Sequence, residues 1–169
     1  MYHSHLIARI LALACFIIHT PGIGTAMADD VKTPMALDDV KSSIVALKAE
    51  TAKLGSPKVE DGELYFGKTK ASNDDVDAVV KKLGGEAMLF IKSGDRYVRV
   101  ATTLNKADHT SAVGTTLDTN SPAITKLNNG EAFYGTAMIF GLPYWVGYEP
   151  ITDASGAVIG AYFAADPQA

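Results

Sequence analysis

Apolar residues recur at two different spacings along this chain, and one of them is helical. Two segments with the helical spacing predict helices over residues 38–53 and 73–83, and a start signal predicts a third, short helix over residues 121–128. The first carries its apolar stripe at Val40, Ile44, Leu47 and Leu54. Glycine or proline follows the first two segments, and Ser121-Pro122 begins the third with a cap residue and a proline at the first helical position.

The other apolar segments are short, rich in aromatic and β-branched residues, and bounded by turn residues, which is typical of strands. Residues 133–166 contain three such runs separated by two turns, so they predict a three-stranded antiparallel meander. Further strands are predicted at residues 63–69, 86–92 and 97–103, with a polar connection at 57–62 and a long surface loop at 104–117. The fold class is therefore α+β, with an antiparallel sheet of about five or six strands and the helix over residues 38–53 packed on one face.

The first 28 residues have the features of a secretory signal peptide. A short region charged only by Arg9 precedes an apolar run, and Ala26-Met27-Ala28 fits the small-x-small cleavage pattern. We therefore predict cleavage after Ala28, a single domain at residues 29–169, and a soluble location in the periplasm or outside the cell. The alternatives are an uncleaved anchor, for which the apolar run is short, or a lipid attached at Cys15, whose preceding residues match a lipobox poorly.

The composition argues against most classes of enzyme and against nucleic-acid binding. Without Arg9 the mature chain has 14 basic and 19 acidic residues, a net charge of −5, which argues against nucleic acid and anionic membrane surfaces. It has no cysteine, and His109 is its only histidine, so thiol catalysis and a multi-histidine zinc site are excluded. No nucleophile elbow, phosphate loop or dinucleotide motif is present. We expect no catalytic activity, no metal and no cofactor.

Arg99 is the most informative residue for a binding site. It lies in the middle of a predicted strand, where an arginine is costly to bury without a partner, and a guanidinium can hold a carboxylate with two hydrogen bonds. Strict alternation places Tyr97, Arg99, Ala101 and Thr103 on one face, and Val98, Val100 and Thr102 on the other. The alternative is an ordinary surface arginine, or one paired with a nearby carboxylate.

Tyrosines on the later strands are candidate walls of a small-ligand pocket. Tyr144 and Tyr148 share one face of their strand, and Tyr134 lies on the preceding strand. A packed core or a cross-strand aromatic pair explains each of them equally well. Strand register decides which of them share a face with Arg99.

Several short motifs occur together in a recognisable order from Leu64 to Asp166. They are Gly-Lys-x-Lys at 67–70, Val98-Arg99-Val100-x-Thr102-Thr103-Leu104, Ala112-Val113-Gly114-Thr115-x-Leu117-Asp118, Gly130-Glu131-x-x-x-Gly135, Gly141-x-Pro143-Tyr144-x-x-x-Tyr148-x-Pro150-Ile151-x-Asp153 and Gly156-x-Val158-Ile159-Gly160. In this order the sequence resembles the extracytoplasmic Cache sensor domains, and it is most similar to the single-Cache group described as a fusion of Cache types three and two.

The resemblance implies a fold and a site. It implies a PAS-like antiparallel sheet with a long N-terminal helix behind it, and a small-molecule pocket on the opposite face. Arg99 with Thr102 or Thr103 would lie in the pocket-forming strand, Tyr144 and Tyr148 on the facing strand, and Tyr134 beside them. The loop at 104–117 would lie near the pocket mouth.

The chain departs from the family pattern because it ends at Ala169, directly after the last predicted strand. We therefore expect a small-molecule binding or sensing module, for a short organic acid or an amino compound, without membrane or signalling parts of its own. The alternative is an accessory module that docks on a membrane sensor kinase or chemoreceptor without a ligand, through Trp145 or the exposed side of the N-terminal helix. A homodimer through that helix is also compatible with the sequence.

Overall fold

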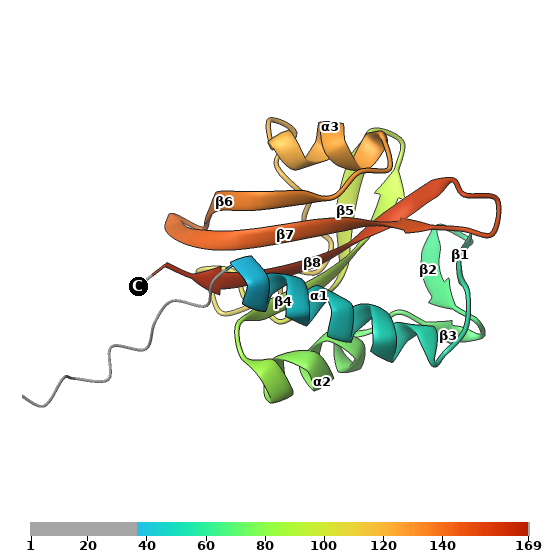
Figure 1. Ribbon diagram of the computed structural model, residues 1–169, viewed down its shortest axis with the longest axis horizontal. Helices are drawn as coiled ribbons and strands as arrows, with labels where there is room; N and C mark the ends of the chain where they lie inside the picture. The colour runs from blue at the N-terminus through green and yellow to red at the C-terminus, as the bar shows by residue number, and fades with distance from the viewer. Residues whose placement is uncertain (1–36, 169) are drawn as a thin grey trace, which may run out of the picture. The chain divides into compact units, whose positions relative to one another are not determined.

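A five-stranded antiparallel sheet forms the centre of the fold. The computed structural model describes residues 37–168, so the predicted signal peptide and Cys15 lie outside the described residues. The sheet has the strand order β5-β4-β8-β7-β6, shown in Figure 1. Its strands are β4 (Glu86–Ser93), β5 (Arg96–Thr102), β6 (Phe133–Ile139), β7 (Leu142–Thr152) and β8 (Val158–Pro167). The last strand thus lies in the middle, where it joins the β4–β5 hairpin to the predicted β6–β7–β8 meander.

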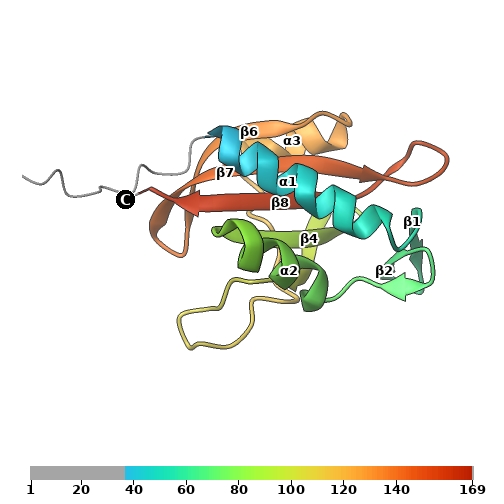
Figure 2. The same ribbon diagram turned by 60° about the horizontal axis from the view of Figure 1, so that its bottom comes forward.

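Two helices cover one face of this sheet. Figure 2 shows α1 (Leu37–Ala52) and α2 (Asn73–Leu83) side by side in front of the strands. Three residues of the predicted stripe, Val40, Ile44 and Leu47, are fully inaccessible to solvent and pack against the sheet, whereas Leu54 lies beyond the end of α1 and is exposed, so that part of the prediction is wrong. Burial of this apolar stripe, rather than helix propensity, holds α1 in place. The predicted helices at 38–53 and 73–83 are confirmed.

A second, small sheet follows α1, and it was only partly predicted. It consists of β1 (Pro57–Glu60), β2 (Glu63–Phe66) and β3 (Thr69–Lys70), in that order. The prediction of a polar connection at 57–62 is wrong, because its first four residues pair with β2 through the turn Asp61-Gly62. Both turn residues have positive φ, and Asp-Gly is a preferred hairpin turn whose signal we missed.

The other face is covered by a helix and a long loop. The predicted short helix is α3 (Pro122–Asn128), and the Ser121 Oγ accepts a hydrogen bond from the Ala123 amide at 3.3 Å. The second half of the loop at 104–117 runs along the outer edge of β5, where Gly114 N donates to Arg99 O and Arg99 N donates to Thr115 O. The sheet is therefore packed on both faces, and the apolar core has one part on each side.

A β-bulge in the β4–β5 pair changes which residues of β5 face each side. Leu89 pairs with Ala101, but Phe90 pairs with Arg99, so Val100 is an extra residue in β5. The prediction that side chains alternate strictly between the two faces beyond Arg99 is therefore wrong. Ala101, predicted on the face of Arg99, packs in the core on the helix side.

The α+β class and the long helix behind an antiparallel sheet are confirmed, and the arrangement is the PAS-like one. Within residues 37–168, none of the helices has the length and apolar character needed to span a bilayer.

Candidate ligand-binding pocket

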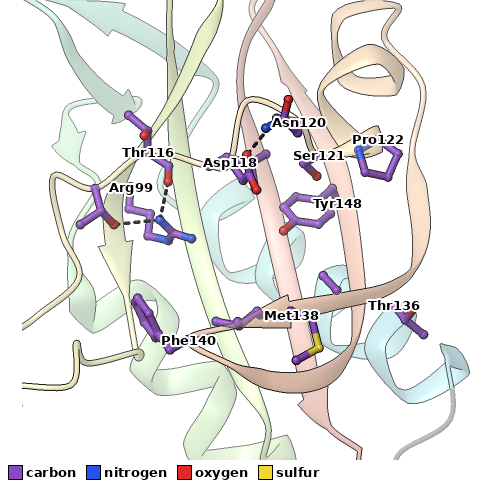
Figure 3. Close-up of a pocket in the computed structure, with 14 residues that line it drawn as sticks. Arg99, Thr116, Asp118, Asn120, Ser121, Pro122, Thr136, Met138, Phe140 and Tyr148 are labelled. Atoms are coloured by element: carbon purple, nitrogen blue, oxygen red, sulfur yellow. Dashed lines mark hydrogen bonds between the residues drawn. The ribbon is translucent and has the colours of Figure 1, made fainter.

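A pocket with a volume of about 440 Å³ lies on the sheet face opposite α1 and α2. It lies between the β5 edge, the segment that leads into α3, and β6 with its turn (Figure 3). Its lining residues are Arg99, Thr115, Thr116, Leu117, Asp118, Asn120, Ser121, Pro122, Thr136, Ala137, Met138, Ile139, Phe140 and Tyr148. A cavity of this size is typical of small-molecule sites.

Arg99 is held rigidly at one end of this pocket. Its Nη1 donates to Thr115 Oγ1 at 2.8 Å and to the Thr116 carbonyl at 2.9 Å, and its Nε lies 3.2 Å from Met88 Sδ. The guanidinium carbon lies 5.2 Å from the centre of the Phe90 ring. The second amino nitrogen, Nη2, makes no hydrogen bond within residues 37–168, and Figure 3 shows it directed into the pocket.

The positive charge of Arg99 has no carboxylate partner among the described residues. Burial lowers the pKa of Arg99, while the neighbouring Tyr148 acts in the opposite direction. A guanidinium nevertheless stays protonated in proteins. A half-buried cation without a counter-ion favours an anion in the adjacent cavity.

Tyr148 is the second polar residue that is held rigidly in the pocket. Its ring packs against three other aromatic rings, those of Phe90, Phe133 and Phe163, at centroid distances of 6.3, 6.2 and 4.6 Å. Its hydroxyl forms no hydrogen bond with any residue in the described part of the chain. Burial raises the pKa of Tyr148 above its ordinary value, with Arg99 opposing, so the hydroxyl is a neutral donor at physiological pH.

The pocket lining contains one other charged residue, Asp118, which lies at the exposed rim of the pocket. Asp118 is exposed, and its Oδ1 accepts a hydrogen bond from the Asn120 amide at 2.9 Å. Arg99 is the single cationic residue of the lining, and Asp118 the single anionic one. Among residues 37–168, no group of three or more His, Cys, Asp or Glu is placed to hold a metal ion.

Of the six residues predicted from sequence, Arg99 and Tyr148 line this pocket together. Tyr144 shares the face of Tyr148 but is buried in the core beside it. The Thr102 hydroxyl accepts from the Leu104 amide, and the Thr103 hydroxyl donates to Glu86 Oε2 at 2.5 Å; neither threonine lines the pocket.

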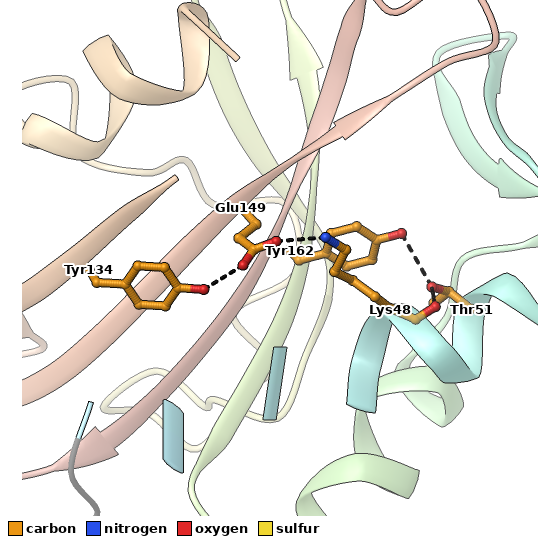
Figure 4. Close-up of polar contacts among 5 residues, drawn as sticks. All are labelled: Lys48, Thr51, Tyr134, Glu149 and Tyr162. Carbon is orange, nitrogen blue, oxygen red and sulfur yellow. Dashed lines mark hydrogen bonds and ion pairs between the residues drawn. The ribbon is translucent and has the colours of Figure 1, made fainter. Parts of the chain in front are cut away.

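Tyr134 lies on the opposite face of the sheet, toward α1. Its hydroxyl donates to Glu149 Oε1 at 2.5 Å, and Glu149 Oε2 pairs with Lys48 of α1 at 2.7 Å (Figure 4). Burial would raise the pKa of Glu149, but hydrogen bonds from Lys48 and Tyr134 outweigh it, and the pKa lies below its ordinary value. Trp145 is half-buried and packs against the core on this side.

The pocket residues contributed by β6 and its turn were not predicted from the sequence. Ala137, Ile139 and Phe140 line the pocket, yet the β6–β7 turn was interpreted only as a turn. The available signal was an exposed aromatic residue in a two-residue turn, Phe140-Gly141.

Comparison with known proteins places this geometry in a family context. The sequence model of the Cache 3/Cache 2 fusion domain matches residues 36–169. Among solved structures, the chain is similar to the sensor domain of DcuS from E. coli, with a TM-score of 0.43, 16% identity, and coverage of 77% of this chain and 84% of that one. It is also similar to RHA1_ro06953, a putative IclR-family transcriptional regulator from Rhodococcus sp., with a TM-score of 0.36, 18% identity, and coverage of 75% and 70%. No curated protein matches the chain.

Proposed function

The chain belongs to the Cache 3/Cache 2 fusion domain family, and on this premise we propose that it senses a small organic acid bound beside Arg99 and Tyr148. The observation that supports this proposal is the unpaired guanidinium of Arg99 at the end of a pocket of suitable size. A carboxylate is favoured over an amine because Asp118, the single anionic residue of the lining, is exposed to water.

The proposed contact is not the pair of parallel hydrogen bonds that a carboxylate can form with a single guanidinium. Both hydrogens of Nη1 are engaged by Thr115 and Thr116, so Nη2 is the part of Arg99 that remains available. One carboxylate oxygen would accept from Nη2 and a hydrogen bond from the Tyr148 hydroxyl would complete the contact. Because neighbouring side chains hold both donors in place, little conformational entropy is lost on binding.

Location and output are part of the same proposal. Cache domains are extracytoplasmic, and the leader-like residues 1–28 are consistent with export to the periplasm or beyond. We propose that the bound state is read by a membrane sensor kinase or chemoreceptor. The intact mass of the exported protein measures the cleavage, since removal after Ala28 leaves a chain that begins at Asp29.

Calorimetric titration and thermal unfolding test the site with a panel of monocarboxylates, dicarboxylates, amino acids and amines. We expect at least one carboxylate to stabilise the protein, by about 2.7 kcal/mol at a hundred times its dissociation constant. Loss of a charge-assisted hydrogen bond costs about 1.5–3 kcal/mol, so Arg99→Ala should weaken binding by roughly 10- to 150-fold. Tyr148→Phe removes a neutral donor and should weaken it by about 2- to 10-fold.

Arg96→Ala is the matched control. Arg96 lies on the same strand, is exposed and does not line the pocket, so its replacement makes the same change in net charge without touching the site. Arg99→Lys keeps the charge but loses the planar set of donors, and it should bind more weakly than the parent. The proposal fails if no carboxylate stabilises the parent, or if Arg99→Ala binds as tightly as Arg96→Ala.

A further inference from the structure

Resting on the proposed function, we infer that the ligand is a monocarboxylate with an apolar tail, and that Phe140 in the β6–β7 turn binds that tail. Three large apolar residues of this turn are strongly exposed: Met138 is 67%, Phe140 54% and Leu142 59% accessible. Phe140 also lines the pocket, and Met138 borders it from β6 with its side chain directed away from Tyr148 (Figure 3). Exposed apolar side chains gathered at the rim of a cavity are typical of a binding surface.

The pocket has a polar wall and an apolar wall. The polar groups come from Arg99 and from residues 115–121, whereas Ala137, Ile139 and Phe140 form the apolar wall contributed by β6 and its turn. In Figure 3 the end of β6 lies on one side of the pocket, and Asp118 and Asn120 lie on the opposite side. A ligand with one polar head and one apolar end matches both walls.

The charges of the lining argue against a dicarboxylate. Arg99 is its single cation, so a second carboxylate directed away from Arg99 would meet either the apolar wall or the Asp118 side chain. Burial of an ionised carboxylate without a partner is costly, and a like charge adds to that cost. An apolar group in the same position instead removes the Phe140 ring from water.

Phe140 is an unusual residue for the turn that it occupies. Ile139 pairs with Leu142, which leaves Phe140 and Gly141 as a two-residue turn with φ of 50° and 85°. Such turns prefer Asn, Asp or Gly at the first position, because a bulky residue with positive φ is strained. The other two-residue hairpin turns within residues 37–168 begin with aspartate or glycine: they are Asp61-Gly62, Gly67-Lys68 and Gly94-Asp95.

An unfavourable backbone conformation and an exposed aromatic ring thus occur at the same residue. Phe140 carries backbone strain and exposes an aromatic ring, and the hairpin itself requires neither. Strained residues occur at functional sites, where a ligand contact compensates for the strain. A bound apolar tail would cover the ring and so account for a phenylalanine at this position.

The test compares the parent protein with Phe140→Asn, which installs the preferred Asn-Gly turn and removes the ring. The probes are 3-phenylpropionate, propionate, succinate and 3-phenylpropylamine, titrated calorimetrically. We expect the parent to bind 3-phenylpropionate at least about tenfold more tightly than propionate or succinate, and to bind the amine weakly or not at all. In Phe140→Asn the affinity for 3-phenylpropionate should fall by about tenfold, propionate should bind as before, and the melting temperature should not decrease.

Two further variants serve as a control for the loss of an apolar side chain and as a substitute for Phe140→Asn. Val113→Asn removes an exposed apolar side chain that does not line the pocket, and it should leave every affinity unchanged. If Phe140→Asn folds poorly, Ile139→Val on the same wall removes one methylene group and should reduce binding of 3-phenylpropionate by a few-fold while propionate binds as before.

The outcomes separate this inference from the proposed function. Binding of propionate or succinate with no gain from the phenyl group, or equal binding by the parent and Phe140→Asn, would overturn the tail assignment alone. Failure of every acid to bind the parent would overturn the proposed function itself. Tighter binding of the amine than of 3-phenylpropionate would overturn both, because it would place the charge preference at Asp118 instead of Arg99.

Discussion

The hydrogen bond from Tyr134 to Glu149 can be removed with little change in shape by Tyr134→Phe. It joins β6 to β7 on the face that α1 covers, at 2.5 Å, and Lys48 of α1 holds the other carboxylate oxygen at 2.7 Å (Figure 4). The Glu149 side chain is 22% exposed, so the bond is only partly screened by water.

The expected loss follows from the charge of the acceptor. Hydrogen bonds to charged groups contribute about 1.5–3 kcal/mol, and because Tyr134 is half-buried we take the lower end, about 1.5 kcal/mol at pH 7. With a urea m-value of about 2 kcal/mol/M, the unfolding midpoint should fall by roughly 0.75 M. Trp145, the one tryptophan of the chain, is half-buried on this face, so its fluorescence can report the unfolding transition.

Acid should reduce the difference between the two proteins. The folded pKa of Glu149 is lowered from 4.5, so its stabilising contribution is fully present above that value and is lost as the pH falls through the folded pKa. At lower pH only a neutral hydrogen bond remains to be lost, and the difference should shrink to about 0.5 kcal/mol. A difference that stays the same from pH 7 down to an acidic pH at which Glu149 is protonated, or one below about 0.5 kcal/mol at pH 7, would refute this reasoning.

Tyr65→Phe is the control for the loss of a hydroxyl. Tyr65 lies in β2 under Lys58, and its hydroxyl forms no hydrogen bond with another residue of the described chain. The variant should change the free energy of unfolding by less than about 0.5 kcal/mol at either pH.

Two further predictions concern the sheet and the pocket wall. Gly160→Ala should destabilise the protein by about 1–3 kcal/mol, because the added Cβ would lie 2.2 Å from the Phe90 carbonyl oxygen; an unchanged urea midpoint would contradict this. Ser121→Ala should remove the cap of α3 and lower stability by about 1 kcal/mol in thermal unfolding, whereas Ser42→Ala on the exposed side of α1 should have a smaller effect. Equal losses from the two serine variants would argue against the cap.

The elements themselves were largely predictable because their local signals are strong. Apolar stripes bounded by glycine or proline located α1 and α2 to within a residue or two at their ends, and turn residues separated the strands of the meander. The missed strand β1 has the sequence PKVE and is buried on neither side, so it carries no apolar pattern. Its pairing depends on the Asp61-Gly62 turn and on β2.

The candidate site was less predictable because it depends on strand register. Tyr134 and Tyr148 lie on neighbouring strands and look equivalent in sequence, but Phe133, not Tyr134, pairs with Tyr148, so the two tyrosines face opposite sides. The extra residue Val100 in β5 similarly reverses the faces of the residues after it, so that Thr102, which pairs with Met88, and not Thr103, shares the face of Arg99. No turn residue in the sequence marks this bulge, which only the pairing with β4 reveals.

The sequence by itself determined the α+β class, the helix that covers the sheet, the family, and Arg99 as the residue to examine. Only the tertiary structure decided that Tyr148 is the tyrosine that joins Arg99, and that residues 115–122 and 136–140 form two walls of one pocket. The physical reason is that helices and turns are set by residues close in sequence, whereas the pocket is formed by segments far apart in the chain. Cross-strand packing brings those segments together, and a shift of one residue reverses the side that each faces.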